Sequence, residues 1–485
     1  MEDKKSVLGI DLGTSSVKVL QRYADGTVIK SKRSYKETGT AAWWDAVCKA
    51  LSEATLQDVE AIGLSSQVGT YIIDGQDVIR WDCGIGAEEL AQMKKQYSRE
   101  LFLKEISMPH PNIASYPIPR LKYIREHYPD VKKVCQPKDF ICERLTGNWV
   151  TDSYSWRGLA NLETKKYSTY FLDAIGLTKE HLPEMIGDTT LAGYTRERAL
   201  CTEDEESGGA DTGGAQKKHG NVMLPAGIPV YVGLNDYYAS LLGMGIQNVG
   251  DMFDISGTSE HLGIIERSVN VDTKLVSGPY VHDNVHYGVT ASSGASLDFG
   301  LQFCENRKIA LEAEKKRNPP IFLPYLNGER APIWDADARG MFFGVSAGCS
   351  KEDMAYAVME GVVFSLYHIY ESMGKPDAAM MRIAGGAAVN PVLNQLKAEM
   401  FGIPAAVMEE KDTSALGAAM VAAVGAGWYA DFGEAAADLC KIRERIEPDG
   451  TYREWLEKRF SIYKKLYPAV KGQYEALRRI AECNV

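Results

Sequence analysis

Two apolar runs, about half the chain apart, each carry an aspartate and lead into the tripeptide Gly-Thr-Ser. The first run covers residues 7–12 and enters the tripeptide at 13–15. The second covers residues 251–255 and enters it at 257–259. A further apolar run follows each tripeptide, and a strand, a short turn of small residues and a second strand are typical of a β-hairpin. The repetition indicates that the chain consists of two duplicated halves.

Helices and strands alternate through the rest of the first half. Residues 121–127 have a helical pattern that ends at Pro129, and residues 228–233 form a buried-strand pattern that runs into Asn235-Asp236. Residues 201–220 are first acidic and then rich in glycine. We expect that segment to be a mobile surface insertion.

The second half has clearer helices. Ser350 is an expected N-cap, and Asp353, three residues later, completes a pattern close to a capping box. Apolar residues at helical spacing follow it and predict a helix. Asn390 is an expected N-cap of the next helix. Small residues at 415–419 predict a helix with a face suited to close packing. Strands alternating with helices in both halves predict α/β domains.

Length and composition narrow the classes of protein that remain. The chain has 485 residues, which predicts more than one domain, and we place the domains at 1–247 and 248–485. The formal net charge of −11 argues against a nucleic-acid partner. Nine cysteines without a CxxC pair favour a reduced, cytoplasmic protein. No signal-peptide or membrane-spanning pattern is present, so we expect no membrane partner.

The first Gly-Thr-Ser turn has the groups that a phosphate requires. Gly13 permits a positive φ, and the backbone N–H groups of a tight turn converge on an anion. The hydroxyls of Thr14 and Ser15 add donors, and Lys18 could neutralise charge. Asp11 could hold Mg²⁺ directly or through water, because Mg²⁺ prefers oxygen ligands. Taken alone, a plain hairpin with a buried aspartate explains this turn equally well.

The second turn, with Gly257 and Thr258, favours the phosphate interpretation, because two such turns could hold neighbouring phosphates of one nucleotide. Asp236 follows a buried strand, where ligands of α/β sheets collect, and it could accept the proton of an acceptor hydroxyl. The alternative is an aspartate that caps the following helix. Gly385-Gly386 could let a flat ligand lie against the backbone or could be a packing turn. The chain has no GxxxxGK[ST] motif, so it is not a P-loop enzyme.

At these residues the chain resembles the FGGY family of carbohydrate kinases, within the actin/hexokinase/heat-shock ATPase superfamily. Residues 9–15 match the superfamily broadly, whereas residues 323–332 and 338–344 match the family more specifically. The resemblance covers residues 9 to about 428 and is nearest to the xylulokinase-like branch. It implies two duplicated actin/hexokinase-like (ribonuclease H-like) α/β domains with an interdomain cleft.

The resemblance also implies a role for each candidate residue. It implies ATP and Mg²⁺ as cofactors, Asp236 as the catalytic base and Asp11 as the magnesium-associated aspartate. Phosphate and adenosine contacts are expected from Gly13, Thr14, Ser15, Lys18, Gly257, Thr258, Gly385, Gly386, Ala387 and Asn390. Gln67, Val68, Trp81, Asp236 and Tyr237 are expected around a small sugar or polyol. Gln67, Trp81 and Tyr237 could equally be core packing.

The expected acceptor pocket departs from the family pattern. Trp81-Asp82-Cys83-Gly84-Ile85 lacks the Asp and Arg of Trp-x-Asp-x-Arg, and Gln67-Val68-Gly69-Thr70 replaces Gln-Met-His-Gly. These losses remove directional hydrogen bonds to sugar hydroxyls, so the acceptor and its reacting hydroxyl stay open. Two alternatives to an active kinase also stay open: a non-kinase ATPase of the superfamily, and a degenerate kinase that binds a sugar. The assembly is open too, with a homodimer as one option.

Overall fold

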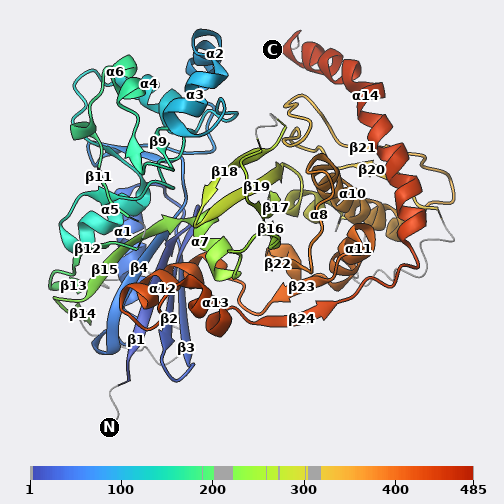
Figure 1. Cartoon of the computed structure of the whole chain (residues 1–485). Coiled ribbons are helices and arrows are strands. Elements are labelled where there is room, and N and C mark those ends of the chain that lie inside the picture. Colours follow the sequence, from blue (N-terminus) through green and yellow to red (C-terminus); the bar gives the residue numbers. More distant parts are fainter. Residues whose placement is uncertain are drawn as a thin grey trace, which may run out of the picture. The chain divides into compact units, whose positions relative to one another are not determined.

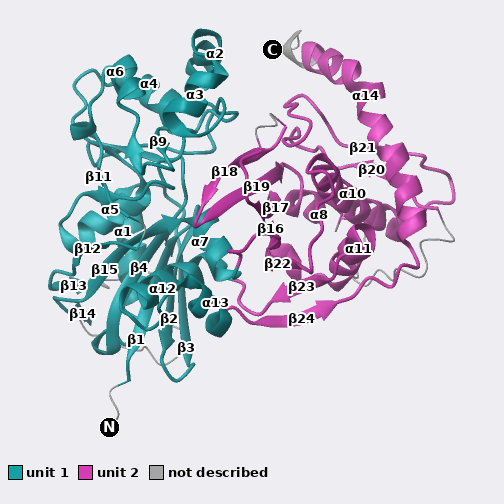
Figure 2. Ribbon diagram, in the orientation of Figure 1, with its two compact units in different colours: residues 1–245, 412–439 teal, residues 246–411, 440–485 magenta. Residues whose placement is uncertain are grey.

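The computed structural model describes residues 4–187, 189–200, 222–257, 259–270, 274–300, 302–303 and 318–483. The insertion expected at 201–220 lies outside these residues. The chain forms two compact units, coloured separately in Figure 2. Unit 1 comprises Met1–Gly245 and Asp412–Leu439, and unit 2 comprises Ile246–Lys411 and Cys440–Val485. Each unit is therefore built from two separate stretches of sequence.

A six-stranded sheet forms the centre of unit 1 (Figure 1), in the order β12-β15-β4-β1-β2-β3. These strands are β1 (Ser6–Leu12), β2 (Ser16–Tyr23), β3 (Val28–Ser34), β4 (Val59–Ser66), β12 (Leu191–Tyr194) and β15 (Pro229–Asn235). Strands β1, β4 and β15 are parallel, whereas β2, β3 and β12 are antiparallel to their neighbours. The predicted first hairpin is confirmed as β1–β2, and the strand predicted at 228–233 is confirmed as β15.

A seven-stranded sheet forms the centre of unit 2, in the order β18-β19-β17-β16-β22-β23-β24. These strands are β16 (Met252–Ser256), β17 (Glu260–Glu266), β18 (Val276–Tyr280), β19 (Asp283–Thr290), β22 (Met381–Gly385), β23 (Ala405–Met408) and β24 (Ile442–Ile446). Apart from the extra edge strand β18, the order and strand directions repeat those of unit 1. The predicted duplication and second hairpin are confirmed, because β16–β17 stands where β1–β2 stands in unit 1.

Helices pack around each sheet. In unit 1 they are α1 (Thr40–Leu51), α2 (Ala87–Gln96), α3 (Arg99–Ile106), α4 (Pro117–His127), α5 (Pro137–Thr146), α6 (Thr169–Ile175), α7 (Asp236–Gly243), α12 (Thr413–Gly425) and α13 (Phe432–Leu439). One core lies between the sheet, α1 and α5, and a second lies among α2, α3, α4 and α6. The predicted helix at 121–127 is confirmed as the later part of α4.

In unit 2 the described helices are α8 (Gly294–Gly300), α10 (Lys351–Ser372), α11 (Pro391–Phe401) and α14 (Arg453–Cys483). The capping box of Ser350 and Asp353 is confirmed at the start of α10, because each side chain bonds the other residue's backbone N–H. Asn390 is confirmed as the N-cap of α11. No described helix has both the length and the apolar character that crossing a membrane requires.

The smaller strands are short and complete the connections. They are β5 (Tyr71–Ile73), β6 (Asp77–Ile79), β7 (Val134–Cys135), β8 (Val150–Thr151), β9 (Ala160–Asn161), β10 (Lys166–Tyr167), β11 (Glu184–Met185), β13 (Arg198–Leu200), β14 (Val222–Leu224), β20 (Ile321–Leu323) and β21 (Met341–Phe343).

Helix α12 packs unusually close to the sheet of unit 1. A Cβ atom added to Gly9 of β1 would lie 2.0 Å from the carbonyl oxygen of Ala415, and one added to Gly63 of β4 would lie 1.9 Å from that of Ala418. Only glycine permits this approach of helix and strand backbones. The small-residue face predicted for this helix is thereby confirmed. The contact brings the start of α12 to the carboxyl end of β1.

Candidate active site

The carboxyl ends of three parallel strands bring the candidate residues of unit 1 together. The register pairs Asp11 of β1 with Ser65 of β4, and Ser66 of β4 with Asn235 of β15. Asp236 follows at once as the first residue of α7. Ligands of open α/β sheets collect at such an edge. Residues far apart in sequence, Asp11 and Asp236, therefore belong to one site.

The first turn keeps its donors free for an anion. The N–H of Gly13 donates to the carbonyl of Ser16 at 2.9 Å, and Tyr35 donates its hydroxyl to the carbonyl of Gly13 and its N–H to that of Ser15. Within the described residues, the N–H groups of Thr14 and Ser15 have no hydrogen-bond partner, and both residues are exposed. The turn is thus held by the N–H of Gly13 and by two carbonyls, which leaves two N–H groups at exposed residues available to an anion.

Asp11 is buried and held by two hydroxyls. Ser65 donates to its Oδ1 at 2.9 Å, and Ser414 at the start of α12 donates to its Oδ2 at 2.6 Å. Burial raises the pKa of Asp11, although Ser414, Lys18 and Ser65 oppose that rise. The sequence did not indicate either serine. Ser65 stands at a strand end beside the candidate Gln67, but nothing local marks Ser414, which is 403 residues from Asp11.

The surroundings of Asp11 fit a magnesium ion bound through few protein atoms. Its carboxylate has a fixed orientation, and Mg²⁺ commonly takes one or two carboxylates together with waters and phosphate oxygens. The described residues contain no group of three or more His, Cys, Asp or Glu side chains that could enclose a metal. Lys18, predicted to neutralise phosphate, forms an ion pair with Asp412 at 2.7 Å.

Asp236 lies partly buried at the N-terminus of α7. The side chain of Asn235 caps this helix by accepting from the N–H of Tyr238. The N-cap is therefore Asn235, and not Asp236 as the alternative interpretation held. Burial and the nearby charge of Asp11 raise the pKa of Asp236 to about 7, although the N–H of Tyr237 donates to it. A carboxyl group with this pKa can accept a proton near neutral pH.

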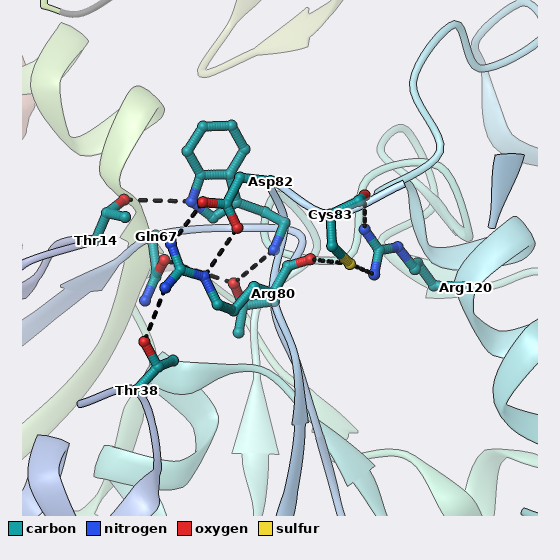
Figure 3. A network of polar contacts seen from close by, with 9 residues as sticks. Thr14, Thr38, Gln67, Arg80, Asp82, Cys83 and Arg120 are labelled. Atoms are coloured by element: carbon teal, nitrogen blue, oxygen red, sulfur yellow. Dashed lines mark hydrogen bonds and ion pairs between the residues drawn. The ribbon is translucent and has the colours of Figure 1, made fainter. Parts of the chain in front are cut away.

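Two of the candidate acceptor residues, Trp81 and Gln67, lie beside the first turn (Figure 3). The indole N–H of Trp81 donates to the hydroxyl of Thr14 at 3.3 Å, and the backbone N–H of Trp81 donates to the hydroxyl of Thr70. Gln67 is buried, and its backbone N–H donates to the carbonyl of Leu12 at 2.8 Å. Trp81 and Gln67 therefore both lie next to the first Gly-Thr-Ser turn, whereas Val68 and Tyr237 are half-buried on the flanking segments.

An arginine that sequence analysis overlooked lies in the same group. Arg80 binds Asp82 with two hydrogen bonds, of 2.9 and 2.5 Å, and also donates to Thr38 at 3.0 Å (Figure 3). Arg120 is buried and donates to the carbonyl oxygen and sulfur of Cys83. The segment that lacks the family's Asp and Arg at their usual places thus carries its own bidentate pair, shifted along the chain. In the sequence, the position of Arg80 next to the candidate Trp81 was the signal that could have identified it.

The candidate nucleotide residues of unit 2 occupy two neighbouring strand ends. Gly257 is exposed; its N–H donates to the carbonyl of Ser259, and its carbonyl accepts from Gly294. Thr258 lies outside the described residues. Gly385 has a φ of +99°, and a Cβ there would lie 2.0 Å from the carbonyl oxygen of Ser256. Gly385 therefore allows β22 to lie against β16 immediately before the turn.

The segment after β22 leads into α11. Gly386 is exposed and Ala387 is half-buried. Asn390 accepts from the N–H groups of Val392 and Leu393 at 3.0 and 3.2 Å. These residues form a short turn between strand and helix, with glycine where a ligand could approach the backbone.

The two aspartates of the repeated motif do not have equivalent positions. Asp11 stands two residues before Gly13, whereas Asp254 stands three before Gly257. Because side chains alternate along a strand, this shift places Asp254 on the opposite face from that corresponding to Asp11. Asp254 is fully buried beneath α11. The likeness of the motifs therefore does not extend to a second metal-associated aspartate.

Two family models match most of the chain. The N-terminal domain of the FGGY family of carbohydrate kinases matches residues 6–202, and its C-terminal domain matches residues 253–426. The chain belongs to this family. As an FGGY carbohydrate kinase it is a phosphotransferase with an alcohol group as acceptor.

Individual FGGY relatives differ in the acceptor that their names give. The xylulose kinase of Staphylococcus xylosus is 27% identical, over 95% of this chain and 99% of its own length. The structure of a gluconate kinase from Lactobacillus acidophilus has a TM-score of 0.82 at 23% identity, covering 98% of this chain and all of its own. A Plasmodium falciparum glycerol kinase with ADP has a TM-score of 0.77 at 17% identity, covering 96% and 98%. These structures share the fold of this kinase.

Proposed function

We propose that this kinase transfers the γ-phosphate of ATP to a hydroxyl of a small sugar, polyol or sugar acid, with Asp236 as the general base. The placement of Asp236 supports this proposal most strongly. It lies at the carboxyl edge of the parallel strands, one strand away from the Asp11–Ser65 pair, and its pKa is raised to about 7. Such a carboxyl group matches the need of phosphoryl transfer to an alcohol.

In the proposed reaction, Asp236 accepts the proton of the acceptor hydroxyl as its oxygen attacks the γ-phosphorus. A new oxygen–phosphorus bond forms, the bond between the γ-phosphorus and the bridging oxygen breaks, and ADP leaves. Gly13, Thr14, Ser15 and Lys18 bind phosphate oxygens. Mg²⁺, associated with Asp11, neutralises charge on the phosphates when bound.

We assign the remaining nucleotide contacts to unit 2. Gly257 and Thr258 are proposed to bind phosphate, and Gly385, Gly386, Ala387 and Asn390 are proposed to line the adenosine site. The exposure of Gly257 and Gly386 supports these roles, because a ligand can approach the backbone there without meeting a side chain.

On the acceptor side, Gln67, Val68, Trp81 and Tyr237 are proposed to surround the substrate. Names of relatives suggest xylulose, glycerol and gluconate as the first compounds to test. The shifted Arg80–Asp82 pair supports an acceptor preference different from that of relatives with the usual pattern. The cytoplasmic location and the homodimer stay predictions.

A coupled assay of ADP release with ATP and Mg²⁺, over ketoses, alditols and aldonates, tests the proposal. We expect at least one acceptor to stimulate ADP release well above hydrolysis in its absence, with a phosphorylated product. Asp236→Ala should abolish that stimulation. ATP hydrolysis that no acceptor increases would favour an ATPase instead. Acceptor binding without turnover would identify a degenerate kinase.

A further inference from the structure

Three ionisable side chains form a buried cluster between the second hairpin, β16–β17, and α11. Lys397 of α11 contacts the carboxylates of Asp254 on β16 and Glu260 on β17, the latter at 2.5 Å. All three side chains are fully buried. Asp254 and Glu260 lie on one face of the hairpin, because Asp254 pairs with Leu262 and Ser256 with Glu260. We call these three residues the Lys397 cluster.

The two carboxyl groups of the cluster differ in their affinity for a proton. Burial and the charge of Glu260 raise the pKa of Asp254 well above its usual range. Burial opposes ionisation of Glu260 too, but Lys397 and the hydrogen bond from Asp254 lower its pKa overall. Lys397 stays charged because both carboxyl groups outweigh its burial. Buried charges persist only when paired in this way.

The three residues connect two segments to which nucleotide contacts are assigned. Glu260 directly follows Ser259, so it fixes the second strand where that strand leaves the turn at Gly257. Lys397 lies seven residues beyond Asn390 on the same helix, so its position fixes α11 along its axis. A rigid helix transmits that position to its own N-terminal turn.

We propose that the Lys397 cluster is a positioning device that holds the turn at Gly257 and the start of α11 in fixed register, so that one nucleotide meets both. It rests on the proposed nucleotide site. None of its three residues needs to touch the ligand. Their buried contacts position the turn at Gly257 and the start of α11, and it is these two segments that contact the nucleotide.

Calorimetric titration of the full chain with ADP, together with amide hydrogen exchange without nucleotide, tests this role. Lys397→Met should weaken ADP binding about tenfold or more. It should also speed exchange at 252–257 and 386–397. Asp254→Asn should bind ADP within about twofold of the wild type, because the raised pKa of Asp254 favours its protonated form, which an amide resembles in shape and charge.

A matched control is the buried ion pair of Glu360 and Arg459, with contacts of 2.6 and 2.7 Å, which joins α10 to α14 in the same unit. Glu360→Gln should lower the melting temperature but leave the affinity for ADP and exchange at 252–257 unchanged. If Lys397 contributed only to stability, Lys397→Met would behave like Glu360→Gln, with a lower melting temperature and an unchanged affinity for ADP.

A folded Lys397→Met variant that binds ADP as tightly as the wild type would overturn the inference. If that variant does not fold, Glu260→Gln replaces it, since it removes the negative charge that pairs with Lys397 at the start of β17. Unchanged ADP affinity in that variant would overturn the inference in the same way. If the wild type binds no ADP, the proposed nucleotide site is wrong. The exchange measurement alone then decides whether the cluster joins the two segments.

Discussion

At the scale of single residues, Asp236 owes its suitability as a base to its surroundings. Burial and Asp11 raise its pKa to about 7, so it loses its proton only as the pH passes neutrality. We expect kcat/KM to fall about tenfold per pH unit below that value and to level off above it. Initial rates between pH 5.5 and 8.5, with the best acceptor, measure this profile.

A variant separates the base from other titrating groups. Asp236→Asn should reduce kcat by about 10²–10⁴ and abolish the dependence on pH near 7. Asp25→Asn, at an exposed carboxylate of the same unit, is the control and should behave as the wild type. A wild-type profile that stays flat from pH 6 to 8 would contradict the role of Asp236.

Ser414 illustrates a residue that acts through another. Its hydroxyl donates to Asp11 Oδ2, so Ser414→Ala leaves that oxygen without its donor. We expect the Mg²⁺ concentration for half-maximal rate to rise about tenfold, in line with the loss of groups that orient metal ligands. Removal of Mg²⁺ with a chelator should stop the wild type. Ser372→Ala, which removes a hydroxyl bound to the carbonyl of His368, should leave the Mg²⁺ requirement unchanged.

At the scale of elements, sequence was most informative where structure is local. Both hairpins, the capping box of Ser350 and the cap at Asn390 follow from neighbouring residues, and Asp236 was identified from the strand before it. Three features depend on distant packing instead. These are the hydroxyl of Ser414 on Asp11, the shift of Asp254 to the opposite strand face, and the pairing of Lys397 with that aspartate. A shift of one residue is small in a sequence motif, but it places the side chain on the opposite face of the strand.

The contact between α12 and the sheet gives a prediction for an element. Gly9→Ala would place a methyl group 2.0 Å from the carbonyl oxygen of Ala415, which forces the helix away. We expect a loss of about 1–3 kcal/mol in the free energy of unfolding, together with lower activity because Ser414 moves with the helix. Gly39→Ala is the control, since nothing lies within 4 Å of its added atom. Equal melting temperatures for both variants would contradict the close approach.

At the scale of the whole molecule, buried titrating groups set the dependence of stability on pH. Burial raises the pKa of Asp236 and Glu329 to about 7 and of Asp139 to about 6, well above their values in an unfolded chain. The folded state therefore takes up more protons than the unfolded state as the pH falls from 8 towards 6.5, and folding becomes more favourable.

Two buried histidines act in the opposite direction at lower pH. Burial lowers the pKa of His261 and His368 to about 4, so below about 6.5 the unfolded state gains protons there that the folded state does not. We expect the melting temperature to rise from pH 8 to 6.5 and then level off. Thermal unfolding in a series of buffers measures it. A melting temperature that increases steadily with pH between 6.5 and 8 would contradict the raised carboxyl pKa values.

The discontinuity of unit 1 also affects how the protein forms during synthesis. The strands of its sheet are complete by residue 235, but α12, which packs on that sheet, and α13, which packs on α12, come from residues 412–439. At about 5–20 residues per second, the ribosome needs roughly 10–40 s to make the intervening chain. During that interval the nascent first unit presents the backbone around Gly9 and Gly63 against which α12 later packs. Its final folding step thus waits until nine-tenths of the protein has been translated, when chaperones that bind exposed sheet surface have had ample time to act.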